Sequence, residues 1–192
     1  MFPSFMKRVS LLFFLFASAA IFTALPTQAT TLISDPSRTA FEALAVRADA
    51  AVHVEVTNQT YRLVGGRIVT DSECRVLAAG YGANAGETIT VTTLGGRWGL
   101  YAQKIDGIEA FVPGDHLAML LTPPGYMAGG RMIVGFSYGI FRSQGESADT
   151  PLFAVDRPFP SGVSRESQAR SDDTPASVGE FLARATAAKG AR

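Results

Sequence analysis

Apolar and polar residues alternate along much of the chain, and the alternation is clearest from residue 51 onward. Val52, Val54 and Val56 are separated by polar side chains, a period of two that is typical of a strand with one buried face. The same alternation places His53 on the outward, solvated face. This part of the fold is therefore predicted to be a half-buried strand.

Glycine divides the alternation into a series of short strands. Gly65-Gly66 separates residues 61–64 from residues 67–78 and predicts a hairpin, because paired glycines adopt positive φ at little cost. Further strands are predicted at residues 88–94, 100–105, 117–121, 132–141 and 152–155. Segment 132–141 shows the most regular alternation, and the glycines on its second face indicate a close neighbour or a bend.

Two helices are predicted to flank the strands. Ser34-Asp35-Pro36 is typical of a helix start, and apolar residues spaced three and four apart follow it, so a helix is expected over residues 34–49. Ser177 and Glu180 match a capping box, and residues 177–192 are expected to form a short amphipathic helix. This helix docks on the strands or frays; a dedicated partner-binding helix is the alternative.

Six or seven short strands with glycine-rich turns predict a mainly β fold. Residues 30–155 are expected to form an OB-like antiparallel barrel in preference to a sandwich, because such a barrel accommodates an initial helix and a strongly bent sheet. Residues 156–176 turn to Pro, Ser, Arg and Asp with few apolar side chains, which is typical of a flexible linker. The chain is thus divided into one β domain, a linker and a short C-terminal helix.

Residues 1–29 have the three parts of a secretory leader. Lys7-Arg8 is a basic stretch, an apolar run covers residues 9–25, and small residues around Ala29 fit a cleavage site. The apolar run is at the lower limit for crossing a bilayer, so a cleaved signal peptide is favoured over a retained anchor. We expect a mature chain that begins at Thr30, is periplasmic or secreted, and has no stable membrane span.

Composition and charge narrow the function classes. Removing 29 of the 192 residues leaves 163, enough for one domain with its own core. The leader carries two of the 17 basic residues and none of the 17 acidic ones, so the mature chain has a net charge of −2 and no basic run. Nucleic acid is therefore not an expected partner. Cys74 is the single cysteine, and its place in an apolar alternation predicts burial.

One motif is similar to a catalytic motif. Gly135-Phe136-Ser137-Tyr138-Gly139 fits the G-x-S-x-G pattern of serine hydrolases, in which a strand-to-helix turn exposes the serine. That pattern needs a histidine after the serine, whereas His53 and His116 both precede it. The residues after the motif also continue a strand. A serine hydrolase that uses Ser137 is therefore the alternative to a binding protein.

No other group of residues predicts a cofactor or metal site. His53 and His116 lie 63 residues apart and match no metal-ligand spacing, even with Asp115 beside His116. No catalytic, cofactor-binding or metal-binding residue is therefore assigned. A set of aromatic residues has two interpretations, a groove for sugars or peptides and the filling of a small barrel. These residues are Tyr81, Trp98, Tyr101, Tyr126, Phe136, Tyr138 and Phe141.

Four glycine-containing motifs between residues 51 and 141 are shared with a group of small secreted bacterial proteins of largely unknown function. They are Gly66-Arg67-Ile68-Val69-Thr70, Thr93-Leu94-Gly95-Gly96, Phe111-Val112-Pro113-Gly114-Asp115 and Val134-Gly135-Phe136-Ser137-Tyr138-Gly139-Ile140-Phe141. The chain resembles this group over about half of its mature length. The resemblance implies an OB-like barrel, similar to segments that accompany matrixin-type zinc proteases. No HExxH helix is present, so it implies no protease activity.

The main functional prediction is an exported, non-enzymatic binding or accessory domain. It is expected to bind a protein, such as an exported protease, or an extended ligand through an edge or groove of the barrel. The prediction depends on the lack of a catalytic triad, a metal cluster or a phosphate-binding loop in the sequence. Serine hydrolysis by Ser137 and a structural role in the cell envelope are the alternatives. No cofactor is expected.

Overall fold

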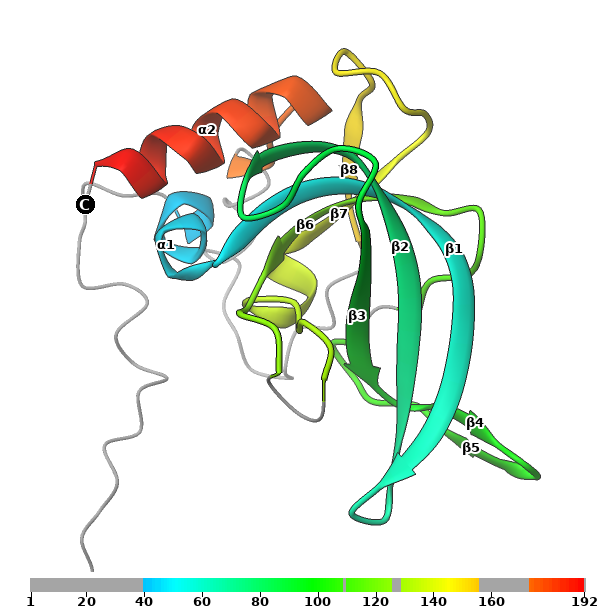
Figure 1. The fold of residues 1–192 in the computed structure, drawn as a ribbon. Coiled ribbons are helices and arrows are strands. Elements are labelled where there is room, and N and C mark those ends of the chain that lie inside the picture. Colours follow the sequence, from blue (N-terminus) through cyan, green and yellow to red (C-terminus); the bar gives the residue numbers. More distant parts are fainter. Residues whose placement is uncertain (1–39, 109, 126–128, 156–172, 192) are drawn as a thin grey trace, which may run out of the picture. The chain divides into compact units, whose positions relative to one another are not determined.

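The computed structural model describes residues 40–108, 110–125, 129–155 and 173–191, which are mainly β (Figure 1). The strands are β1 (Ala50–Val64), β2 (Arg67–Tyr81), β3 (Thr88–Leu94), β4 (Gly96–Trp98), β5 (Tyr101–Gln103), β6 (His116–Leu121), β7 (Ile140–Ser143) and β8 (Leu152–Ala154). The helices are α1 (Ala40–Arg47), the 3-10 turn η2 (Phe136–Tyr138) and α2 (Val178–Gly190). The predicted leader (1–29), residues 34–39 of the predicted first helix and residues 156–172 of the predicted linker lie outside the described residues.

The larger sheet is antiparallel, with the strand order β3-β2-β1-β6-β7-β8, and β4 and β5 form a separate hairpin. β1 and β2 are joined at Gly65 and Gly66, whose φ angles of +55° and +78° confirm the predicted glycine turn. β1 is a single strand of 15 residues that runs up to this turn. A register shift between Val56 and Asn58 marks the start of its polar half.

A short segment beginning at Arg131 lies between β3 and β6, although these strands are not neighbours in the larger sheet. Arg131 pairs in parallel with β3 through backbone hydrogen bonds to Thr90 and Thr92, at 2.9 and 2.8 Å. Two residues later, Ile133 pairs antiparallel with Leu121 of β6. The segment therefore contacts strands from both halves of the sheet.

β1 separates two apolar clusters, and its alternate side chains point into different ones. The inner cluster lies on the face of Val52, Val54 and Val56, as the alternation predicted. It also contains Cys74, Val76, Ile89, Val91, Phe111, Leu117, Met119, Leu121 and Ile140. Cys74 is fully buried, which confirms the prediction, and burial raises the pKa of its thiol to about 12. The thiol is therefore protonated at neutral pH and packs as a small apolar group.

α1 and α2 cover the opposite face of β1, which we call the outer face (Figure 1). Phe41 of α1, Phe181 of α2 and Phe141 of β7 pack edge to face there, with ring centroids 5.4 to 6.1 Å apart. Ser177 caps α2 by accepting from Glu180 N at 3.3 Å, which confirms the predicted helix start. The C-terminal helix thus docks on the sheet. Within the described part of the chain, neither α-helix has the length and hydropathy to cross a bilayer.

The prediction that His53 is solvated is wrong, because an apolar cluster, here called the outer cluster, covers the outer face of β1. Its side chain points to the outer face, as the alternation predicted, but it is fully buried there rather than solvated. Its neighbours on that face, Ala51 and Ala118, belong to the cluster that the two helices complete. Part of this cluster comes from α2, far away in the sequence, so the pattern around His53 did not indicate burial.

The prediction of one regular strand over 132–141 is wrong. The middle of this segment forms the 3-10 turn η2, with φ of +74° at Gly135 and +55° at Phe136, and β7 begins only at Ile140. A Cβ added at Gly139 would lie 1.9 Å from the carbonyl oxygen of Val134, so the turn closes tightly on that glycine. The glycines that fitted a strand pattern instead allow the chain to turn.

Candidate functional site

A groove of about 750 Å³ opens where the ends of β1, β2 and β3 meet the β4–β5 hairpin. Figure 1 shows this hairpin at the opposite end of β1 and β2 from the two helices. The groove is lined by Gln59, Tyr61, Thr70, Thr93, Leu94, Gly95, Gly96, Arg97, Ala102, Gln103, Lys104, Ile105, Ile108, Ala110, Phe111 and Val112. Its volume falls within the range of small-ligand pockets, roughly 300 to 1,000 Å³.

Two glycines shape the groove where β3 ends. Gly95 and Gly96 have φ of +96° and +121°, a region that side-chain-bearing residues rarely adopt. A Cβ on Gly96 would lie 2.4 Å from Thr70 Oγ1 and 2.8 Å from the ring of Tyr61. Thr70 Oγ1 also donates to Gly95 O at 2.8 Å. Glycine at these positions therefore lets β4 turn back against the ends of β1 and β2.

Glutamine side chains tie the wall of the groove to the sheet. Gln103 of β5 accepts a hydrogen bond from Ile68 N through its Oε1, at 3.0 Å. Gln59 of β1 donates through Nε2 to the carbonyl oxygen of Phe111, at 2.5 Å. Both bonds join residues more than 30 positions apart in sequence. The groove is therefore formed by tertiary contacts rather than by one local loop.

The groove has a positively charged lining and exposed apolar residues beside it. Within the described residues, its charged lining consists of Arg97 and Lys104, and no carboxylate lines it. A concave surface with one sign of charge attracts ligands of the opposite sign. Trp98, Leu100 and Tyr101 of the adjoining hairpin are exposed, Tyr101 to 75%. Exposed apolar residues gathered beside a groove are typical of an interaction surface.

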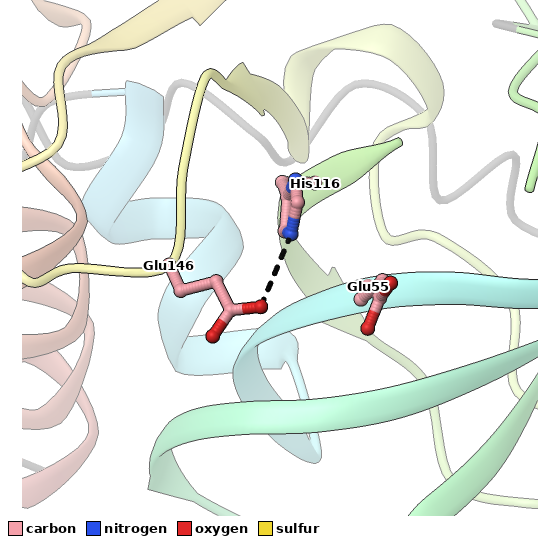
Figure 2. Close-up of side chains that lie close together, drawn as sticks. All are labelled: Glu55, His116 and Glu146. Carbon is pink, nitrogen blue, oxygen red and sulfur yellow. Dashed lines mark ion pairs between the residues drawn. The ribbon is translucent and has the colours of Figure 1, made fainter. Parts of the chain in front are cut away.

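A second group of polar side chains lies on the outer face, where we call it the outer polar cluster. Glu55 of β1 lies opposite His116 of β6 in the antiparallel pairing of these two strands. Glu146 comes from the loop between β7 and β8. Figure 2 shows the Glu146 carboxylate directed toward the His116 ring, with Glu55 beside them. One ligand atom from each of the three lies within 4.8 Å of the others, and His116 Nε2 is 3.7 Å from Glu146 Oε1.

Arg75 of β2 offsets part of the negative charge of this cluster. Its Nη2 lies 2.5 Å from Glu55 Oε2 and 3.5 Å from Glu146 Oε1. The contact with Glu55 has two guanidinium nitrogens, since Nε lies 3.1 Å from the same oxygen. Arg75 therefore holds Glu55 firmly and Glu146 loosely.

The imidazoles next to the cluster have nitrogen atoms without hydrogen-bond partners. Neither ring nitrogen of His53 has a partner, and Nε2 of His116 has none either. The two rings lie 6.3 Å apart between centroids. Burial, with a smaller contribution from His116, lowers the pKa of His53 from 6.5 to about 4, while Glu146 opposes the shift. His53 is therefore neutral at physiological pH.

The sequence drew attention to Ser137, and the structure places it in η2 with only 4% of its surface exposed. It lies in a 3-10 turn, so it is neither in the predicted strand nor at an exposed strand-to-helix elbow. The aromatic residues singled out from the sequence fit both interpretations, a ligand groove and the filling of the core. Trp98, Tyr101, Phe136 and Tyr138 are exposed, whereas Phe141 is in the outer cluster. Tyr126 lies outside the described residues.

Both sites depend on residues that the sequence did not single out. Glu55 fell on a predicted solvated face and Glu146 in a loop, so no spacing joined them to His116. The strand β4 was missed because Gly95-Gly96 is typical of a strand end. The chain matches no known protein-family profile and no curated protein. Its function is therefore inferred from these two sites.

Proposed function

We propose that the protein is an exported binding domain that holds a protein partner in the groove beside the β4–β5 hairpin and catalyses no reaction. One observation carries the proposal: within the described residues the groove is lined by two cations and no carboxylate, and it adjoins an exposed apolar hairpin. Export is expected from the leader pattern of residues 1–29.

An OB-like barrel is the proposed frame for the groove. The segment at Arg131 pairs with β3 on one side and, through Ile133, with β6 on the other, which supports closure in the order β1, β2, β3, this segment and β6. In OB-like barrels the face of the second and third strands and the adjoining loops bind ligands. The groove is lined in part by residues of β2 and β3, which supports the proposed frame.

The lining suggests the chemistry of the partner segment. Arg97 and Lys104 favour acidic side chains, and exposed Trp98 and Tyr101 favour apolar or aromatic ones. Aromatic and arginine residues are the types that contribute most to protein interfaces. The proposed ligand is therefore an extended polypeptide segment that carries both acidic and apolar residues.

The lining also supports binding without catalysis. It contains no histidine, cysteine or carboxylate among the described residues. Nucleophilic and general acid-base mechanisms most often use such a group to activate a nucleophile or transfer a proton. The two histidines are on the outer face, with the polar cluster, rather than in the groove. The composition of the lining thus favours recognition of a ligand over its chemical conversion.

Selection of displayed random peptides on the mature protein tests the proposed function. We expect enrichment of peptides with acidic and aromatic residues, and charge reversal at Arg97→Glu with Lys104→Glu should weaken their binding by at least about tenfold. The matched control is Arg47→Glu, an exposed arginine on α1 that does not line the groove. Binding that survives the double reversal, or selective binding of single-stranded DNA or oligosaccharides instead, overturns the proposal.

Fractionation of the native host tests export. N-terminal sequencing of the soluble exported fraction should start at Thr30, because the residues before it match a signal-peptidase site. Recovery of the intact leader, or of the protein only in washed membrane or cell-wall fractions, counts against the proposal. The latter result favours a structural role in the envelope.

A further inference from the structure

The outer polar cluster has the composition of a metal site. Three side chains from separate parts of the fold, Glu55, His116 and Glu146, converge with one ligand atom each within 4.8 Å of the others. Tetrahedral zinc with bonds of about 2.0 to 2.1 Å holds its ligand atoms about 3.3 Å apart. The 3.7 Å between His116 Nε2 and Glu146 Oε1 is close to that spacing. Side-chain rotations that shorten separations of at most 4.8 Å would close the site.

A second observation points to a missing ligand at this place. His116 Nε2 is buried without a hydrogen-bond partner, because Glu146 at 3.7 Å is too far to accept one. His53, fully buried beside it, has no partner for either ring nitrogen. Buried polar atoms in native proteins almost always have a partner. Unpartnered imidazole nitrogens next to two carboxylates fit a bound cation.

We propose that Glu55, His116 and Glu146 bind one divalent transition-metal ion of the zinc type. The mixture of one nitrogen and two oxygen ligands favours zinc or cobalt over magnesium or calcium, which prefer oxygen alone. Three protein ligands leave a fourth position for water.

Arg75 is compatible with this site. It keeps two contacts with Glu55, so it can orient that carboxylate while the metal takes the other oxygen. Its contact with Glu146 is longer, at 3.5 Å, and its side chain is 47% exposed. The guanidinium therefore can leave Glu146 when a dication replaces its charge. The metal would tie the loop of Glu146 to β1 and β6.

Calorimetric titration of the untagged, EDTA-treated mature protein with Zn²⁺ tests the proposal. We expect one ion per chain, a raised Tm with Zn²⁺, and visible d–d absorption with Co²⁺. His116→Ala and Glu146→Gln should each raise the Kd by at least about tenfold and abolish the increase in Tm. Glu146 is 59% exposed in its side chain, so Glu146→Gln should fold normally even if His116→Ala does not.

Controls separate this site from the groove and from adventitious binding. Glu73→Gln removes an exposed carboxylate of β2 outside the cluster and should leave the Kd unchanged. Arg97→Glu with Lys104→Glu should also bind Zn²⁺ normally, so the two proposals fail independently. No heat of binding in the wild type, or the same Kd in Glu146→Gln as in Glu73→Gln, overturns the metal site.

Discussion

His53 and His116 lie on the outer faces of neighbouring strands, β1 and β6, with their ring centroids 6.3 Å apart. His53 is fully buried and neutral, whereas His116 lies at the edge of a polar cluster that solvent reaches. Two residues of the same type, brought together by strand pairing, are thus held in different environments. The difference has consequences for stability.

The burial of His53 predicts a loss of stability in acid. Its pKa is about 4 in the folded chain and about 6.5 when unfolded, so between these values the unfolded state binds the extra proton. The contribution of neutral His53 to the free energy of unfolding is fully present above pH 6.5. It is lost as the pH falls toward 4, by about 3 kcal/mol in all. Urea unfolding of metal-free protein at pH 7.5, 5.5 and 4.5 measures it.

His53→Leu is the matched variant for this effect. Leucine fills a similar volume and has no ring nitrogens to leave unpaired, so stability at pH 7.5 should be equal or greater. The difference between the variant and the wild type should then grow as pH falls toward 4. A parallel pH dependence in the two proteins would assign the acid sensitivity to other groups.

Gly96→Ala should destabilise the end of the sheet that forms the groove. The added methyl group meets Thr70 and Tyr61, and φ of +121° is unfavourable for alanine, so we expect a loss of about 2 to 4 kcal/mol. Gly190→Ala is the control, since Gly190 of α2 has open space and no positive φ. It should be neutral or stabilising by up to about 1 kcal/mol. Thermal unfolding compares the two.

Phe181→Ala should detach α2 from the outer face. The ring is fully buried and packs edge to face on Phe41 and Phe141, so its loss should cost about 3 to 5 kcal/mol. Ala187→Ser on the exposed side of the same helix should change stability by less than about 1 kcal/mol. Hydrogen exchange of α2 amides should increase in the first variant alone. Unchanged exchange would show that α2 is held by other contacts.

Ser137→Ala should leave hydrolysis of a chromogenic ester at the background rate of the wild type. Ser137 is 4% exposed within η2, so a substrate carbonyl has no approach to its hydroxyl. The assay compares initial rates of both proteins with buffer alone. A wild-type rate above background that disappears in the variant would restore the serine hydrolase alternative.

Local pattern was sufficient for elements whose neighbours are close in sequence. The hairpin at Gly65-Gly66, the strand Thr88–Leu94 and the helix start at Ser177 depend on residues within a few positions, and all three are confirmed. The features that the sequence pattern did not predict depend on packing between residues far apart in the sequence. The burial of His53 depends on a covering layer whose helices come from both ends of the described chain. The strand predicted over residues 132–141 failed because alternation cannot distinguish glycines that extend a strand from glycines that turn it.

The outer polar cluster was not predicted for the same reason. Glu55 and His116 meet because β1 and β6 pair, and Glu146 reaches them only through the loop that follows β7. Metal sites that are recognisable in sequence have ligands a few residues apart on one helix or hairpin. Here the nearest two of the three ligands are 30 positions apart, so strand pairing, rather than sequence spacing, brings them together.

The contact between the two helices sets the order in which this chain completes its fold. Phe41 N donates to Asp173 Oδ2 across 132 positions, and Lys189 of α2 reaches the carbonyl oxygen of Val46 across 143. A chain that emerges N-terminus first, from a ribosome or a translocation channel, can pair its strands while α1 still has no cover. The aromatic surface around Phe41 therefore stays open to chaperones and proteases until α2 has emerged. Chaperones and proteases would recognise a polypeptide that stalled before α2 by this exposed surface.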